Sequence, residues 1–321
     1  MAKILLINPN KWGRGITHIW IAAHTGLLKK NGHKVELFDA TFFNNWRHNE
    51  EDFEKEFLKT DYDKLVTFKN EDVYKELEKK INQFNPDIIF WSAISSHIHS
   101  EGEYVNIQNG HDLLKNVAIP KNVILITGGL QSTSAPHLVL EKMIKIQYLI
   151  RGESEMALND IANCVDNNKT FLHMPGLAYK ENDLIKLNSP QKILKNLDII
   201  SPYDYSIFDK QVFLKKYNGQ VYRGVDYELS RGCIYSCAYC VETIIQKYYG
   251  FEEKSEKTGA IKNFKSYLRH KTADMAFLEI KNLHEHYGVQ IFRCQDTNFL
   301  TIDRDTLINL AAKIEESKFD I

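Results

Sequence analysis

The segment Ser230-Arg-Gly-Cys-Ile-Tyr-Ser-Cys-Ala-Tyr-Cys240 holds three of the five cysteines in this chain of 321 residues. The cysteines follow the spacing C-x3-C-x2-C, and Tyr239 stands directly before the last of them. A loop that curls on itself can direct three thiolates so spaced toward one metal centre. We therefore predict that Cys233, Cys237 and Cys240 are metal ligands.

The supply of further ligands separates two kinds of metal centre. A structural zinc site is closed by four ligands, and the nearest downstream histidine is His270, thirty residues after the last cysteine of the motif. A four-iron, four-sulfur cluster held by three cysteines instead leaves one iron open to a substrate or cofactor. The spacing favours the open cluster, and a zinc site completed by the distant Cys294 is the alternative. For Cys294 and Cys164, inert packing is the simpler explanation.

Length and composition limit the other possibilities. The chain is long enough for two or three domains, and its 43% of apolar residues suffices for packed cores. A net charge of −1 gives no indication of a nucleic-acid partner. The sequence has no signal peptide and no run near the ~18 apolar residues of a membrane span. Five cysteines, three of them clustered, form no disulfide framework, so we expect a cytoplasmic protein without a membrane partner.

The first half of the chain alternates short apolar runs with helical patterns, over residues 17–30 and 137–146 for example. This alternation predicts βαβ units and a doubly wound parallel sheet, a Rossmann-like domain over residues 1–170. Residues 43–80 are charged and predict a solvated insertion with one amphipathic helix. The expected strands are Lys3–Ile7, Val35–Phe38, Asp87–Ser92, Asn122–Thr127 and Tyr148–Ile150.

Ligands of open parallel sheets bind beyond the carboxyl ends of the strands. Those ends are rich in small and polar residues here, so a large ligand could approach the backbone closely. The glycine fingerprint of nicotinamide domains is missing, because His18 stands where the third glycine would be. His97 and His99 could face such a ligand, although solvated loop histidines are the commoner case. The candidate residues at this edge are Asn8, Ser95, Ser96, Gly128, Gly129 and Glu153.

Residues 171–222 predict a small hairpin, turning at Asn182-Asp183, and an inter-domain linker with weak periodicity. A second βα series follows over residues 223–321. Its expected elements are a strand over 225–230, the cysteine loop, a helix from 241, an amphipathic helix over 271–287, a strand over 289–292 and a helix over 304–317. Two βα units cannot close a barrel, so we expect the opening of a partial (β/α) TIM-like barrel, truncated relative to a complete enzyme.

The cysteine motif, its place after the first strand of a βα series and the upstream sheet resemble the radical S-adenosylmethionine superfamily. More narrowly, they resemble its subclass with an N-terminal cobalamin-binding domain. Gly128-Gly129, the run Arg151–Glu155 and the linker from Leu197 to Asp204 support the narrower resemblance. Gln131 departs from it, because family members usually carry a histidine there.

The resemblance implies the cofactors and their contacts. Cys233, Cys237 and Cys240 would hold a 4Fe-4S cluster whose open iron takes S-adenosylmethionine, and reductive cleavage would give a 5′-deoxyadenosyl radical. Tyr239, Asp296 and Asn298 would contact S-adenosylmethionine. Cobalamin would lie on the candidate residues at the sheet edge. No Asp-x-His occurs in the chain, so the cobalt-binding histidine of methionine-synthase-like domains is absent.

The implied function is an enzyme that methylates, cyclises or rearranges an unidentified substrate. An electron donor such as flavodoxin or ferredoxin would be its partner. One alternative is a radical S-adenosylmethionine enzyme that has lost cobalamin. The other is a non-catalytic binding protein stabilised by zinc or by an iron–sulfur centre.

Overall fold

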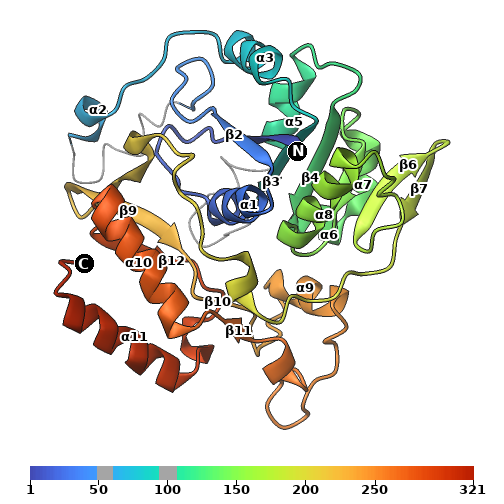
Figure 1. Ribbon diagram of the computed structural model, residues 1–321. Helices are drawn as coiled ribbons and strands as arrows, with labels where there is room; N and C mark the ends of the chain where they lie inside the picture. Colours follow the sequence, from blue (N-terminus) through green and yellow to red (C-terminus); the bar gives the residue numbers. More distant parts are fainter. Residues whose placement is uncertain (49–60, 94–106) are drawn as a thin grey trace.

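The computed structural model describes residues 1–48, 61–93 and 107–321 (Figure 1). Ser95, Ser96, His97 and His99 lie outside the described residues. No described helix is long and apolar enough to cross a membrane.

A seven-stranded sheet organises the first half of the chain, in the order β2-β1-β3-β4-β5-β6-β7. The first five of these strands are parallel. The prediction of a doubly wound parallel sheet is therefore confirmed, and the strand order reverses between β1 and β3. The strands are β1 (Lys3–Asn8), β2 (Lys34–Asp39), β3 (Ile88–Ala93), β4 (Ile124–Gly129), β5 (Tyr148–Ile150), β6 (Leu177–Glu181) and β7 (Leu184–Leu187).

Helices cover both faces of this sheet, which explains why its strands read as continuous apolar runs. Ile4 and Leu6 of β1 pack with α1 (Ile19–Lys30) and α8 (Glu155–Asp166). Leu5 and Ile7 point the other way. They pack with α3 (Val73–Phe84), α5 (Ile107–Lys115) and α7 (Pro136–Lys142).

Several boundaries differ from the sequence-based expectation. The amphipathic helix expected within 43–80 is α3, preceded by the short α2 (Tyr62–Leu65). The helix expected over 137–146 begins earlier, as α6 (Leu130–Ser134) and α7. The hairpin β6–β7 turns at Asn182-Asp183, as expected, and both residues have positive φ. This hairpin continues the first sheet through antiparallel pairing with β5, while the boundary at residue 170 stays a prediction.

The second half is built on a three-stranded sheet with the order β12-β9-β8. The strands β9 and β12 are parallel and joined through α10, which confirms the second βα series. A separate two-stranded ribbon, β10–β11, flanks the cysteine loop. The elements are β8 (Leu214–Tyr217), β9 (Gln220–Tyr227), β10 (Ser230–Arg231), α9 (Glu242–Tyr248), β11 (Arg269–His270), α10 (Ala273–Tyr287), β12 (Ile291–Cys294) and α11 (Arg304–Ser317).

Four 3-10 helices lie in the linker and the second half: η2 (Leu197–Ile200), η3 (Lys210–Phe213), η4 (Phe264–Ser266) and η5 (Phe299–Thr301). The linker passes directly over α1, where the Asp204 amide donates to the Ala22 carbonyl at 3.0 Å. Gly26 permits this approach, because a Cβ there would lie 2.5 Å from the Pro202 carbonyl oxygen. One apolar core therefore continues from the α1 face of the sheet, through the linker, into the second half.

Candidate functional site

The cysteine loop lies between β10 and α9, on the side of the first sheet where α6 and α9 meet (Figure 1). Gly232 opens the loop with φ 97°, and a Cβ there would lie 2.7 Å from the Tyr267 carbonyl oxygen. Glycine is thus required by the backbone angle and by the close approach.

Gln246 of α9 braces the loop from inside. Its amide nitrogen donates to the carbonyls of Cys233 and Tyr235, both at 2.9 Å, and its amide oxygen accepts from the Ser236 hydroxyl at 2.8 Å. This side chain is buried, so its three bonds fix the loop's curvature. The sequence did not indicate this role of Gln246, because nothing in its local pattern predicts hydrogen-bond partners ten to thirteen residues earlier.

The three thiols form no disulfide and are partly buried. The Cys240 amide donates to the Cys237 carbonyl at 3.0 Å and closes a turn. The Cys233 sulfur accepts from the Tyr235 amide at 3.4 Å and from the Asn298 side chain at 3.6 Å.

Within the described ranges, no three His, Cys, Asp or Glu side chains are arranged around a single ion. In a 4Fe-4S cluster each cysteine binds a different iron, so its ligands need not meet at one point. Three soft thiols on one braced loop are a donor set that fits such a cluster.

The structure brings the residues predicted for S-adenosylmethionine to the cysteine loop. Tyr239 is 90% exposed at the tip of the loop, and Asn298 lies against Cys233. Asp296 accepts from the backbone amides of Leu229 and Ser230 at 3.1 and 2.5 Å, just before the loop. Burial raises the pKa of the Asp296 carboxyl. Contacts of these residues with S-adenosylmethionine stay predictions.

At the carboxyl edge of the first sheet, Asn8 donates to Asp39 at 3.0 Å. The remaining side-chain oxygens, Oδ1 of Asn8 and Oδ2 of Asp39, are buried without a hydrogen-bond partner. Burial raises the pKa of Asp39. Gly128 and Gly129 end β4 at the same edge, and the φ of 94° at Gly129 favours glycine. Unpartnered acceptors and bare backbone suit a large polar ligand.

Glu153, predicted from sequence for the same ligand, is engaged elsewhere. Its carboxylate lies 2.7 Å from Arg269 of β11, and its amide donates to the hydroxyl of Tyr249, the residue after α9, at 2.8 Å. Both partners flank the cysteine loop. A role of Glu153 in cobalamin binding stays a prediction.

The loop after β1 contacts the three-stranded sheet of the second half. The buried Asp226 of β9 accepts from the amide and hydroxyl of Thr17, both at 3.0 Å. Lys215 and Arg293 reach the same carboxylate at 3.1 and 2.5 Å. Burial opposes charge on Asp226, but the two cations outweigh it and hold its pKa well below the usual range. Beside this group, burial lowers the pKa of His18 to about 3.

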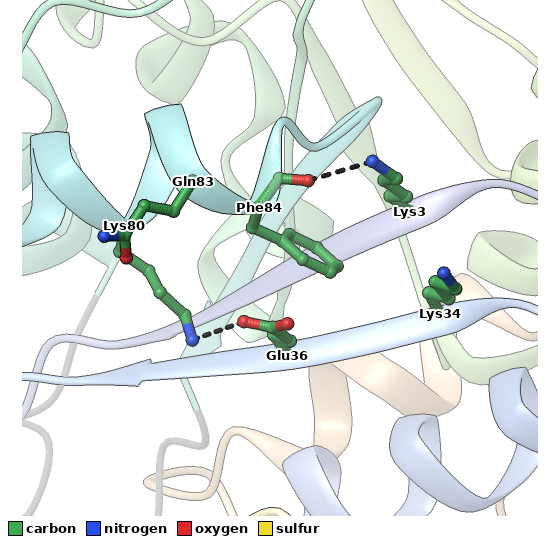
Figure 2. A pocket seen from close by; sticks show the side chains of 6 residues that line it. All are labelled: Lys3, Lys34, Glu36, Lys80, Gln83 and Phe84. Atoms are coloured by element: carbon green, nitrogen blue, oxygen red, sulfur yellow. Dashed lines mark hydrogen bonds and ion pairs between the residues drawn. The ribbon is translucent and has the colours of Figure 1, made fainter.

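A pocket of about 350 Å³ lies at the opposite edge of the sheet, where β1 and β2 begin (Figure 2). Lys3 donates to the Phe84 carbonyl at 3.2 Å, and Lys80 pairs with Glu36 across the opening. The pocket is distant from the carboxyl ends of the strands, so it takes no part in the candidate site.

Several known proteins are similar to this chain in sequence or in structure. No family model matches the chain. An uncharacterized methyltransferase of Pyrococcus horikoshii, PH0819, is 24% identical over 251 residues, which are 77% of this chain and 47% of that protein. The anaerobic magnesium-protoporphyrin IX monomethyl ester cyclase of Synechocystis is 27% identical over 180 residues, 55% of this chain and 31% of that protein.

Among solved structures, the radical S-adenosylmethionine methyltransferase TsrM of Kitasatospora setae, with cobalamin and a 4Fe-4S cluster bound, superposes with a TM-score of 0.60. It is 15% identical, and the match covers 98% of this chain and 52% of TsrM. This likeness confirms the predicted fold. Cobalamin-dependent radical S-adenosylmethionine proteins occur among both the relatives and the structural neighbours. This agrees with the resemblance drawn from the cysteine motif together with the upstream sheet domain. The chain spans about half or less of the length of the relatives described here.

Proposed function

We propose that this chain carries the cobalamin-binding unit and the cluster-binding segment of a cobalamin-dependent radical S-adenosylmethionine enzyme. The observation that carries the proposal is the cysteine loop itself. Three thiols stand on one loop that Gln246 braces and that Asn298 contacts, beside the loops of a parallel-sheet domain.

The chain's own residues have distinct parts in this proposal. Cys233, Cys237 and Cys240 hold the cluster, and Gln246 keeps their backbone curled. Asp296 fixes the chain entering the loop, while Asn298 and Tyr239 lie where S-adenosylmethionine would meet the open iron. When bound, the cluster would supply the electron that cleaves S-adenosylmethionine into methionine and a 5′-deoxyadenosyl radical, and cobalamin would supply a carrier for a methyl group.

Cobalamin would lie at the carboxyl edge of the first sheet. The unpartnered oxygens of Asn8 and Asp39 are suited to amide donors, and Gly128 and Gly129 let the backbone approach a flat ring closely. The proposed reaction is methyl transfer, ring closure or rearrangement of an unidentified substrate. The electron would come from a donor of the flavodoxin or ferredoxin type.

Anaerobic loading of the full chain with iron and sulfide tests the proposal. We expect the wild type to take up about four irons and four sulfides, with broad visible absorption. A variant with serine at positions 233, 237 and 240 should take up none, whereas Cys164→Ser is the control that should match the wild type. A colourless wild-type protein that binds only zinc would contradict the proposal.

Added hydroxocobalamin tests the second cofactor. The full chain should retain it through gel filtration and alter its visible spectrum. Asn8→Leu should weaken retention while leaving iron uptake intact. A chain that loads iron but never retains the corrinoid would refute the cobalamin part alone.

A further inference from the structure

The turn at the carboxyl end of β5, residues Arg151–Glu155, packs against the second half of the chain; we call it the β5 turn. Gly152 has φ 80°, and a Cβ there would lie 2.5 Å from the Tyr249 hydroxyl and 2.7 Å from a Tyr248 ring carbon. The Tyr248 hydroxyl donates to the first carbonyl of the turn at 3.0 Å. The helix that leaves the cysteine loop, α9, therefore rests directly on the β5 turn.

Two arginines bind the same turn from the ribbon β10–β11. Arg231 stands two residues before Cys233, and its guanidinium lies 2.7 Å from Glu155. Arg269, on the paired strand, lies 2.7 Å from Glu153. The side chains of both arginines and of Glu155 are largely buried. The chain entering the cysteine loop is thus tied to the turn that also supports the chain leaving it.

Buried charges of this kind favour one arrangement over others. A buried guanidinium is tolerated only with a carboxylate in hydrogen-bonding contact, so any displacement of the loop leaves charges without partners. Arg231 also pairs with Glu228 at 2.6 Å, and that carboxylate accepts from the Tyr203 hydroxyl of the linker at 2.6 Å. The first unit, the linker and the cysteine loop therefore share one network.

We propose that the β5 turn is the seat of the cysteine loop, and that Glu153 and Glu155 are positioning residues for that loop. The contacts of the β5 turn with the loop support this role by themselves. Only the identity of the group that the loop would hold rests on the proposed function. Chemistry that passes between two cofactors requires a fixed spacing between them, and the seat supplies it by tying the loop to the sheet that would hold the other cofactor.

Hydrogen exchange of the full chain without added cofactors tests the seat directly. In Arg231→Gln, amides of residues 232–241 should exchange on the order of tenfold faster or more, because the Glu155 and Glu228 carboxylates lose their shared counter-charge. In Glu155→Gln the same amides should also exchange faster, but by less, because Arg231 keeps its pair with Glu228. The double variant should be no worse than Arg231→Gln alone, since that substitution already removes the contact with Glu155. Glu153→Gln should give a smaller effect, and Glu155→Asp should partly restore the wild-type rate.

Glu181→Gln, which removes a surface pair with Lys186, is the control and should leave the loop unchanged. Loop exchange unaffected in all seat variants would overturn the inference, and so would acceleration spread evenly over the whole chain. Iron loading in parallel separates the two proposals. A wild type without a cluster would refute the proposed function, whereas the exchange data would still decide on the seat.

Discussion

At the scale of single residues, a fully buried ion pair joins Lys271 and Glu279 at 2.6 Å. Glu279 also accepts from the Tyr203 amide at 2.7 Å and from the Tyr227 hydroxyl at 2.6 Å. Burial lowers the pKa of Lys271. The Glu279 carboxylate therefore has its charge balanced by Lys271 and accepts hydrogen bonds from Tyr203 and Tyr227.

Lys271→Met should destabilise the protein strongly, because it leaves the Glu279 carboxylate buried without a counter-charge. We expect a loss of about 3–5 kcal/mol in the free energy of unfolding, measured with urea. Lys64→Met, at an exposed pair with Asp61, should leave the free energy of unfolding nearly unchanged. Equal losses in the free energy of unfolding would contradict the conclusion that the buried Lys271–Glu279 pair contributes more than an exposed pair.

His18 predicts a dependence of stability on pH. Burial lowers its pKa to about 3 from 6.5, against the opposing charge of Asp226 and with the added repulsion of Lys215 and Arg293. Between these two pKa values the imidazole is protonated in the unfolded chain but neutral in the folded one. The contribution of His18 to stability is therefore fully present above about pH 6.5 and is lost as the pH falls toward 3.

His18→Gln should therefore lose less stability than the wild type between about pH 6.5 and 5. The buried His24 shares the same direction of shift, so part of the slope should persist. Unfolding midpoints at several pH values measure this difference. The exposed His137→Gln is the control; a slope in His18→Gln as steep as in the wild type would count against the buried neutral histidine.

The sequence identified the candidate ligands at this scale but not their supports. The cysteine spacing alone predicted Cys233, Cys237 and Cys240. Asn298 was predicted as a contact of S-adenosylmethionine from the family resemblance. The support from Gln246 and the pairing of Arg231 with Glu155 depend on where separate elements pack, which one sequence does not reveal.

At the scale of elements, the loop after β1 meets the second half through a close backbone contact. A Cβ on Gly15 would lie 2.3 Å from the Val212 carbonyl oxygen. The Lys215 ammonium donates to the Gly15 carbonyl at 2.6 Å, next to the Asp226 cluster. This loop has no room for a side chain at Gly15.

Gly15→Ala should force the loop away from η3 and lower the free energy of unfolding by about 1–3 kcal/mol. Gly26→Ala should act similarly where the linker crosses α1. Lys30→Ala, at the exposed end of α1, should leave the unfolding midpoint nearly unchanged. Thermal unfolding of the three variants checks the ranking, and a tolerated Gly15→Ala would show that the contact is loose.

Elements with strong local signals were predicted well from sequence. The helices α10 and α11 have capping residues, Thr272 and Asp303, that accept from the first-turn amides, and Gly288 ends α10 with positive φ. The hairpin β8–β9 was assigned to the linker instead, although Asn218-Gly219 is a typical two-residue turn. Weak alternation in its strands concealed it, because the residues facing the loop after β1 are polar.

At the scale of the whole molecule, two junctions hold the second half against the carboxyl edge of the first sheet. One joins the loop after β1 to Asp226, and the other joins the β5 turn to the ribbon and α9. The fold class followed from the alternation of apolar runs and helical patterns. The junctions could not be predicted, because their partners lie 76 to 209 residues apart in the chain.

Electron paramagnetic resonance of the anaerobically loaded and reduced full chain, with and without S-adenosylmethionine, tests the central claim most directly. A cluster held by Cys233, Cys237 and Cys240 leaves one iron open, so adding S-adenosylmethionine should change the shape of the spectrum. Replacement of Cys164 by serine should not alter this response. A spectrum indifferent to S-adenosylmethionine, or a response that survives serine at all three positions of the motif, would contradict the account.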